Sequence, residues 1–407
     1  MRVTRVPARL TAAAACATAL ALAVAGCSAT EKLTTGLKVK HAFEKLGEQP
    51  SASVLVSVDG TATDADAFLR AAGAPKGPKT ERTARLLSRG ELTFAVGSDR
   101  EKTPLKDLSR SERLRFATAL NFGTTDVLSA KSVEEKLYVR VRLRSLVAQL
   151  SDSETDRQRA RRLVALAKDL PTTLASAKDA LRGEWVEADP ESFDDFARAA
   201  REITRDEKNG ELDKAPGHTS GKASGKTSDR ASGGTSGKHG ESVSAQNDET
   251  SKRVGRATAA GRALNGESER EFLEGLEKTL GKYAEFKKAG EYGGAEHVTV
   301  SMPARRAAPD LSRALAAVGA HLDPSTVPDR KVSADLQIRR GQLTGLTLDL
   351  EQFLSDKAQA KGVHLPLRMD FGGGDAVPVM APDGARELKP QDLLAAMMYG
   401  ALGTGGI

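Results

Sequence analysis

Cys27 is the residue whose type and position point most directly to a chemical reaction. It closes the run Val24-Ala25-Gly26-Cys27, in which small apolar residues stand immediately before a cysteine. This pattern is typical of a bacterial lipobox, where a diacylglyceryl group is joined to the thiol and the chain is cut just before the cysteine. We therefore expect Cys27 to be the lipidated first residue of the mature chain.

The segment before this cysteine, residues 1–26, has the features of a lipoprotein signal peptide. Three arginines precede an apolar run over residues 10–24, and no acidic residue is present. The run is too short for a permanent membrane-spanning helix. Acyl chains such as palmitate bind a membrane with roughly 0.8 kcal/mol for each buried methylene. We expect a protein held on the extracytoplasmic face of the cell membrane by the lipid on Cys27.

An ordinary cleavage site is the alternative interpretation of the same residues. Ala23-Val24-Ala25 has the A-x-A form, and cleavage there would release a soluble secreted protein beginning at Gly26. Cys27 would then be a lone thiol, because the other cysteine, Cys16, leaves with the signal peptide. Neither interpretation leaves a disulfide in the mature protein.

The charge of the chain argues against a nucleic-acid-binding protein. The formal net charge is +6, and removing residues 1–26 removes three arginines and no acids, which leaves +3 (6 − 3). So small an excess on a chain of 407 residues does not predict binding to nucleic acid or to strongly acidic surfaces. No protein partner can be named from the sequence.

The sequence contains none of the common catalytic signatures. It has no HExxH motif, no G-x-S-x-G nucleophile elbow and no dinucleotide-binding fingerprint. Asp59, Asp64 and Asp66 lack the spacing of a calcium loop, and we interpret them as turn and helix-cap residues. We therefore expect no enzyme, no cofactor and no metal site. The six histidines are scattered at His41, His218, His239, His297, His321 and His364.

Several segments show the two-residue alternation of a strand with one apolar face. Residues 136–143 alternate between apolar side chains on one side and Tyr138 and Arg140 on the other, which we expect to face solvent. Residues 332–338 and 343–350 form a predicted hairpin with Arg340-Gly341 at its turn. Further strands are predicted over residues 52–58, 92–96, 126–133, 184–187, 297–302 and 365–371.

Helical spacing of apolar residues predicts the elements that lie between these strands. Pro171 is expected to break the helical pattern of residues 158–181. The remaining helices are predicted over residues 37–46, 65–72, 192–201, 269–288, 309–318 and 390–402.

A low-complexity tract rich in Ser, Gly and Lys covers residues 206–265. Its composition cannot bury enough apolar surface to order itself, so we predict a disordered insertion. The expected organisation is therefore a signal peptide over 1–26, a lipidated tether over 27–36, and one folded domain in two parts, 37–205 and 266–403.

Strands linked by hairpins, with helices between them, predict an α+β fold: a curved antiparallel sheet, or half-barrel, with helices on its concave face. Together the lipobox, the strand-to-helix units, the 136–143 strand and the 332–350 hairpin resemble the LppX/LprG-type bacterial lipoproteins. Those proteins share with the LolA/LolB carriers a half-open barrel closed by helices around a lipid cavity. The resemblance covers residues 37–205 and 266–402, and the long insertion departs from the family's compact pattern.

The resemblance implies a lipoprotein that binds or carries a hydrophobic, lipid-like ligand. A ligand-free envelope scaffold for other proteins stays open as the alternative function. Methionines near the C-terminus could line a pocket or belong to an ordinary core. We expect the cavity, if present, to be lined by Val54, Val56, Val58, Leu137, Val139, Val141, Leu367, Met369, Met397 and Met398.

Two other groups could contact a ligand or the membrane. The arginines of residues 157–162 could meet an anionic lipid head group, or they could form a solvated helix face. Trp185, the only tryptophan, could be a ligand platform, but a core or rim anchor is the simpler interpretation.

Overall fold

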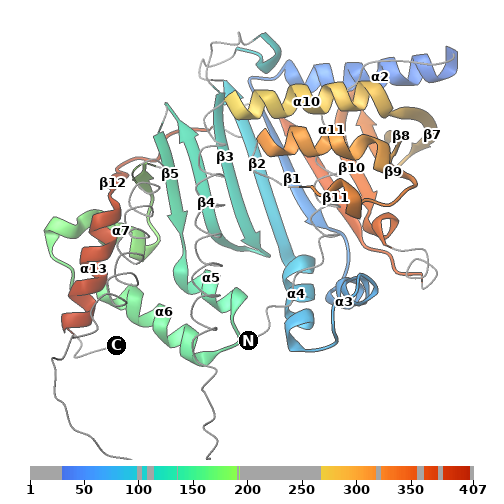
Figure 1. Ribbon diagram of the computed structural model, residues 1–407. Coiled ribbons are helices and arrows are strands. Elements are labelled where there is room, and N and C mark those ends of the chain that lie inside the picture. Colours follow the sequence, from blue (N-terminus) through green and yellow to red (C-terminus); the bar gives the residue numbers. More distant parts are fainter. Residues whose placement is uncertain are drawn as a thin grey trace, which may run out of the picture.

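The computed structural model describes residues 30–98, 103–107, 114–134, 136–189, 192, 267–317, 322–354, 362–374 and 379–403. Within these ranges the chain is α+β, with one open sheet of twelve strands and with helices beside it (Figure 1). The α+β class expected from the sequence is confirmed.

The described strands follow the two-residue alternation of side chains that the sequence shows. Most of them lie within two residues of their predicted bounds. In chain order they are β1 (Ser51–Val58), β2 (Gly90–Ser98), β3 (Leu114–Phe122), β4 (Thr125–Val133), β5 (Lys136–Val141), β6 (Val186–Ala188), β7 (Glu285–Tyr292), β8 (Ala295–Pro303), β9 (Lys331–Arg339), β10 (Gln342–Asp349), β11 (Pro366–Gly373) and β12 (Arg386–Leu388).

The strand order is β12-β6-β5-β4-β3-β2-β1-β11-β10-β9-β8-β7. β1 therefore pairs with β2 on one side and with β11 on the other, so segments from both sides of residues 206–265 share one sheet. All pairs are antiparallel except β12 with β6. The expectation of a purely antiparallel sheet is wrong at this edge. β6 and β12 are about 200 residues apart in the sequence, so no tight hairpin joins them and a parallel pairing is possible.

Two of the helices, α10 and α11, run side by side and pack against each other (Figure 1). Gly275 of α10 permits this close approach, since a Cβ there would lie 2.8 Å from the Cβ of Ala314. The helical elements are α2 (Thr30–Gly47), α3 (Ala62–Ala71), α4 (Pro78–Arg89), α5 (Leu143–Leu150), α6 (Glu154–Leu166), α7 (Ala175–Arg182), α10 (Glu267–Tyr283), α11 (Ala304–Ala317) and α13 (Pro390–Gly403), with short 3-10 turns η1 (Leu105–Asp107), η2 (Thr172–Leu174), η3 (Pro324–Thr326) and η4 (Leu350–Phe353).

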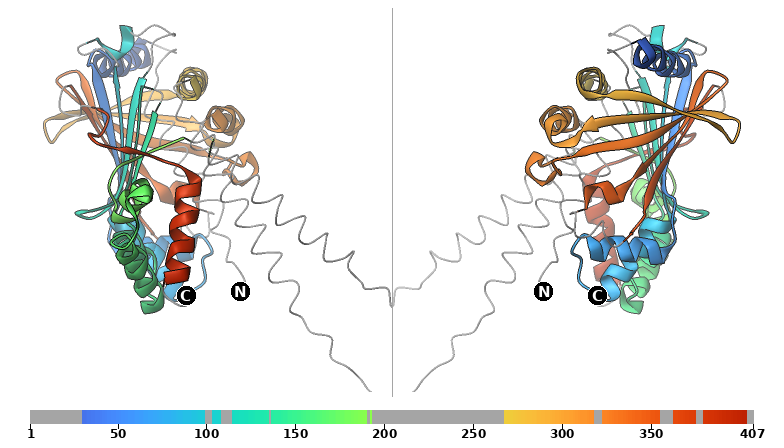
Figure 2. Two further views of the ribbon diagram at one scale, coloured as in Figure 1. Left: turned by 90° about the vertical axis from the view of Figure 1, so that its left-hand side faces the viewer. Right: turned by 90° about the vertical axis from the view of Figure 1, so that its right-hand side faces the viewer.

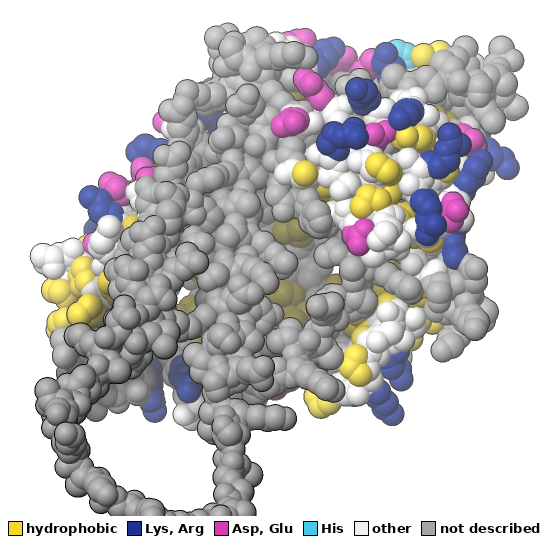
Figure 3. Space-filling model, in the orientation of Figure 1, with side chains coloured by type: hydrophobic (Ala, Val, Ile, Leu, Met, Phe, Trp, Pro, Cys, Tyr) yellow, Lys and Arg dark blue, Asp and Glu magenta, His cyan; other side chains and the backbone are white. Residues whose placement is uncertain are grey.

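The main core lies between the sheet and α2, α3, α10 and α11. α11 turns Ala307, Ala308 and Leu311 inward, where they are fully buried. Its outward side is polar, with Arg306 and Arg313 exposed, and Figure 3 shows basic side chains gathered over this part of the surface. α11 is therefore an amphipathic helix that covers one face of the sheet.

Local sequence signals account for several helix ends. Thr61 and Asp64 form a capping box at the start of α3, with the Asp64 carboxylate accepting from the Thr61 backbone N–H at 2.9 Å. The prediction of helix-cap duty for Asp64 is confirmed. Pro171 separates α6 from α7 as predicted, and Gly183, with φ of 80°, ends α7 in the left-handed region.

Several elements differ from the sequence-based expectation: α4, β3 and β12 were not predicted, and α11 begins five residues before the predicted 309. α2 begins at Thr30, so most of the predicted 27–36 tether is helical. The helix predicted over 269–288 ends at Tyr283, because Glu285–Tyr292 pairs with β8 as the edge strand β7. Leu143 begins α5 and does not extend β5. For β7, pairing with β8 at the sheet edge overrides the helical pattern of residues 285–288. An edge strand also tolerates the charged side chains of β7.

Some predictions fall outside the described residues: the signal peptide, Cys27, the insertion over 206–265 and nearly all of the 192–201 helix. In the part of the chain that is described, no helix is long and apolar enough to cross a membrane.

Candidate ligand-binding face

One apolar row crosses nine neighbouring strands of the sheet on the side that α10 and α11 cover. Each residue of the row lies directly opposite the next in the strand register, because alternate side chains of a strand share a face. From β8 to β5 the row consists of Val298, Leu336, Leu346, Met369, Val56, Leu92, Leu120, Leu128 and Val141.

Burial falls steeply along this row. Leu346 is fully buried and Met369 is 1% exposed, whereas Leu128 on β4 is 37% exposed and Phe94, on the same face of β2, is 41% exposed. The side chains on β2 to β5 that share this orientation belong to none of the buried hydrophobic clusters found among the described residues. Six of them define what we call the β2–β5 apolar face: Leu92, Phe94, Leu120, Leu128, Val139 and Val141.

The predicted lining residues divide between two environments, and one group belongs to the main core. Leu367 and Met369 on β11 are buried there. Val54, Val56 and Val58 on β1 are half-buried and pack against the same core. These five side chains are therefore part of the packed interior beneath the helices.

The second group lies toward the β6 end of the sheet. Val139 and Val141 belong to the β2–β5 apolar face, and Leu137 is half-buried on the same side of β5. On α13, Met398 is 57% exposed, and the described residues do not include the side chain of Met397. The structure therefore does not bring Met398 into the main core with Met369.

Sequence reasoning missed β3 and with it the centre of the β2–β5 apolar face. The alternation of Leu114, Phe116, Thr118 and Leu120 is the signal that could have found this strand. Leu120 lies between Leu92 and Leu128 in the register, so β3 makes the face continuous.

The opposite side of these strands contains Trp185 between two basic side chains. The Lys131 ammonium lies 5.2 Å and the Arg140 guanidinium 4.8 Å from the ring centre. Arg140 also pairs with Asp126. Burial, reinforced by the Arg140 charge, lowers the pKa of Lys131. These contacts place Trp185 as a packed anchor with cation–π partners.

Tyr138 belongs to this same side of the sheet, which we expected to be wet. It is buried, because it packs with Ala95, Val133 and Val379 in a small cluster that also holds Trp185. The expectation of solvent exposure at Tyr138 is wrong, since a segment distant in sequence covers it. Arg140, by contrast, is only half-buried.

The arginines near the start of α6 are paired with acids of the first turn of the same helix. Arg157 and Arg161 lie 3.7 Å and 3.4 Å from Glu154, and Arg159 lies 3.9 Å from Asp156. This arrangement is that of a solvated helix face with local ion pairs.

No protein-family model and no curated protein matches this chain. A groove of about 550 Å³ lies between α2 and the tips of two hairpins, β7–β8 and β9–β10. Its lining includes Lys38, Glu291, Glu296 and Arg340, and none of the predicted lining residues contributes to it. This charged groove does not suit an acyl chain.

Proposed function

We propose that this protein is a membrane-anchored extracytoplasmic lipoprotein that binds a hydrophobic, lipid-like ligand on the β2–β5 apolar face. The observation that supports the proposal is the continuous apolar row, buried from Val298 to Met369 and partly exposed from Leu92 to Val141. The exposed end has the same chemistry as the buried end.

An apolar ligand would gain free energy by covering this face. Removing apolar surface from water contributes roughly 25 cal/mol per Å², or about 0.8 kcal/mol for each methylene of an acyl chain. Contiguous partly exposed apolar side chains commonly mark ligand or partner sites. Leu128 and Phe94, the most exposed members, are the expected centre of contact.

The proposal includes a half-barrel shape for the ligand-bound protein, with helices on its concave side. Helices α10 and α11 stand toward one end of the sheet and α13 toward the other, on the same side (Figure 2). α13 packs on α7 and turns Leu394 and Met398 outward. Such outward apolar side chains could complete the contact with an acyl chain, as the LppX/LprG resemblance implies.

The proposed anchor would keep the ligand-binding domain close to its lipid source. Only Ser28 and Ala29 separate Cys27 from the first residue of α2. A lipidated Cys27 would therefore tether the fold over at most about 10 Å of chain. Two acyl chains give a stable attachment, whereas one gives a reversible attachment.

Lipid binding is tested on the mature chain from residue 27 with Cys27→Ser. We expect native mass spectrometry to show co-purified lipid and a fluorescent fatty acid to bind after delipidation. The double change Phe94→Ser and Leu128→Ser should weaken binding at least about tenfold, since each lost contact contributes about 1 kcal/mol or more.

Leu37→Ser is the matched control, because Leu37 is 48% exposed but lies on α2. It should bind the probe as the parent does. Equal affinity in all three proteins would show that the ligand binds somewhere other than the β2–β5 apolar face. A parent that carries no lipid and takes up none would overturn the carrier function and favour the envelope scaffold.

A further inference from the structure

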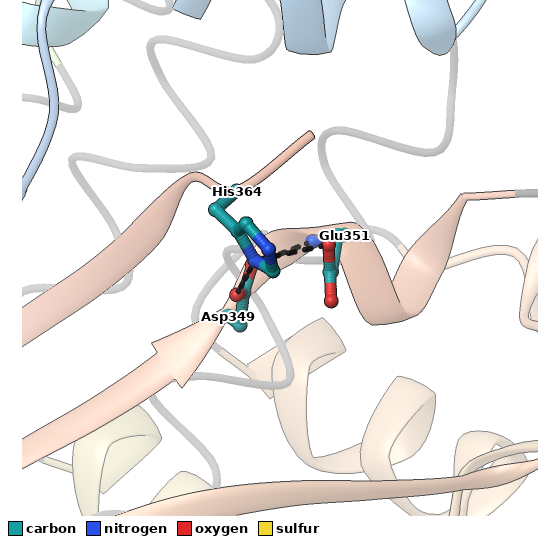
Figure 4. Close-up of side chains that lie close together, drawn as sticks. All are labelled: Asp349, Glu351 and His364. Carbon is teal, nitrogen blue, oxygen red and sulfur yellow. Dashed lines mark hydrogen bonds and ion pairs between the residues drawn. The ribbon is translucent and has the colours of Figure 1, made fainter. Parts of the chain in front are cut away.

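Three side chains from separate elements meet at one end of the β10–β11 pair. Asp349 is the last residue of β10, Glu351 lies in η4, and His364 stands just before β11. The His364 Nδ1 atom is 3.0 Å from Asp349 Oδ2 and 3.1 Å from Glu351 Oε2. Figure 4 shows the imidazole ring directed at the two carboxylates. One ligand atom from each residue lies within 4.8 Å of the others.

The backbone hydrogen bonds around these residues hold two of them in place. Asp349 Oδ1 accepts from the Glu351 N–H at 3.1 Å and from the Leu365 N–H at 3.4 Å. The Leu350 N–H donates to the Leu365 carbonyl at 3.0 Å, which ties η4 to the start of β11. Asp349 therefore uses one oxygen for the backbone and presents the other, Oδ2, to His364.

A second layer of contacts fixes η4 itself. Gln352 Nε2 donates to the Asp349 carbonyl at 3.0 Å and to the Ser333 carbonyl at 2.8 Å. Leu350 and Phe353 are buried in the main core beneath the cluster. Supporting contacts of this kind orient metal ligands and reduce the rearrangement that binding requires.

We propose that Asp349, Glu351 and His364 form a binding site for a divalent transition metal ion, with zinc the best fit. Zinc accepts one imidazole nitrogen and carboxylate oxygens at about 2.0–2.2 Å, and three protein ligands leave a fourth position for water. Calcium and magnesium prefer oxygen ligands throughout, so the histidine argues against them. The His364 side chain is 67% exposed, which gives an ion access from solvent.

This site does not depend on the proposed lipid function. Its ligands lie outside the β2–β5 apolar face, and the sequence alone did not indicate it because the residues do not follow a metal-binding motif. Three residues at i, i+2 and i+15 become a ligand set only when η4 and β11 bring them together.

The experiment is a calorimetric titration of the mature chain carrying Cys27→Ser with zinc chloride, repeated with cobalt to follow the visible spectrum of the bound ion. The parent should bind one equivalent through this site. His364→Asn and Glu351→Gln should each weaken that binding at least about tenfold. Circular dichroism melts without metal would show that both variants remain folded.

His41→Asn is the matched control, since His41 is also exposed and lies 3.1 Å from a carboxylate oxygen of Glu44. Within the described part of the chain, Glu44 is the one acid that forms an ion pair with His41. It should bind zinc as the parent does. Binding that survives in His364→Asn would assign the metal to other groups and overturn the proposal. A parent that binds no zinc at about 1 mM would overturn it as well, because even a Kd of about 1 mM corresponds to a binding free energy of only about −4 kcal/mol.

Discussion

Leu346 and Leu128 lie on the same apolar row of one sheet, yet Leu346 is fully buried and Leu128 is 37% exposed. Five cross-strand pairs connect them, through Met369, Val56, Leu92 and Leu120 on the four strands between. A leucine of the same row is therefore part of the packed core at position 346 and is partly exposed to solvent at position 128.

Matched truncations of these two leucines should separate stability from ligand binding. Leu346→Ala should lower the free energy of unfolding by about 2–5 kcal/mol, because it leaves a cavity in a packed core. Leu128→Ala should lower it by about 1 kcal/mol or less, because its side chain already contacts water. Denaturant melts measure both values, and equal losses would contradict the difference in packing.

The lipid anchor predicts a simple fractionation result. Cys27→Ala should move most of the protein from the membrane to the soluble fraction, since the proposed anchor is the lipid on Cys27. Cell fractionation followed by a salt wash measures the distribution. A mutant that stays on the washed membrane would show that another segment anchors the chain. A wild-type protein found free and beginning at Gly26 would favour the A-x-A site.

Deleting residues 210–260 and joining the ends with a short Gly/Ser bridge should change the free energy of unfolding by about 1 kcal/mol or less. Loop-closure entropy depends only weakly on loop length. β1 and β11 pair through seven residue positions, so the two parts of the chain already share one sheet. A single denaturant transition is expected in both proteins. A loss of several kcal/mol, or a second transition, would contradict this prediction.

Asp310 connects α10 to α11 and gives the fold an acid-sensitive contact. Lys282 Nζ and Tyr283 Oη donate to its Oδ2 atom at 3.0 Å and 3.1 Å. The Lys282 hydrogen bond, with smaller effects from Tyr283 and Arg313, lowers the pKa of Asp310 below its ordinary 3.8. The stabilisation is therefore complete above pH 3.8 and is lost as the pH falls through the lowered pKa.

Asp310→Asn should remove this part of the acid dependence and lower stability near neutral pH by about 1 kcal/mol. Denaturant melts from about pH 2 to pH 6 span the range in which carboxylates titrate. Asp329→Asn, at an exposed bend before β9, controls for the change in net charge. Parallel pH profiles for the parent and Asp310→Asn would refute the assigned contact.

Local patterns in the sequence predicted much of the secondary structure. The alternation around Val54 predicted β1, and Arg340-Gly341, with φ of 51° and 75°, forms the predicted β9–β10 turn. Pro171 breaks the helical pattern where expected. These features depend on backbone sterics and on side-chain period, which nearby residues decide by themselves.

Only the tertiary structure decided which apolar residues are covered and which polar residues meet. Leu346 and Leu128 follow the same alternation, and the packing of α10 and α11 over one end of the sheet distinguishes them. β7 is a strand because β8 offers it a free edge, and His364 meets Asp349 because β10 and β11 are neighbours. The physical reason is that each outcome depends on a partner distant in sequence, which local propensity and periodicity do not encode.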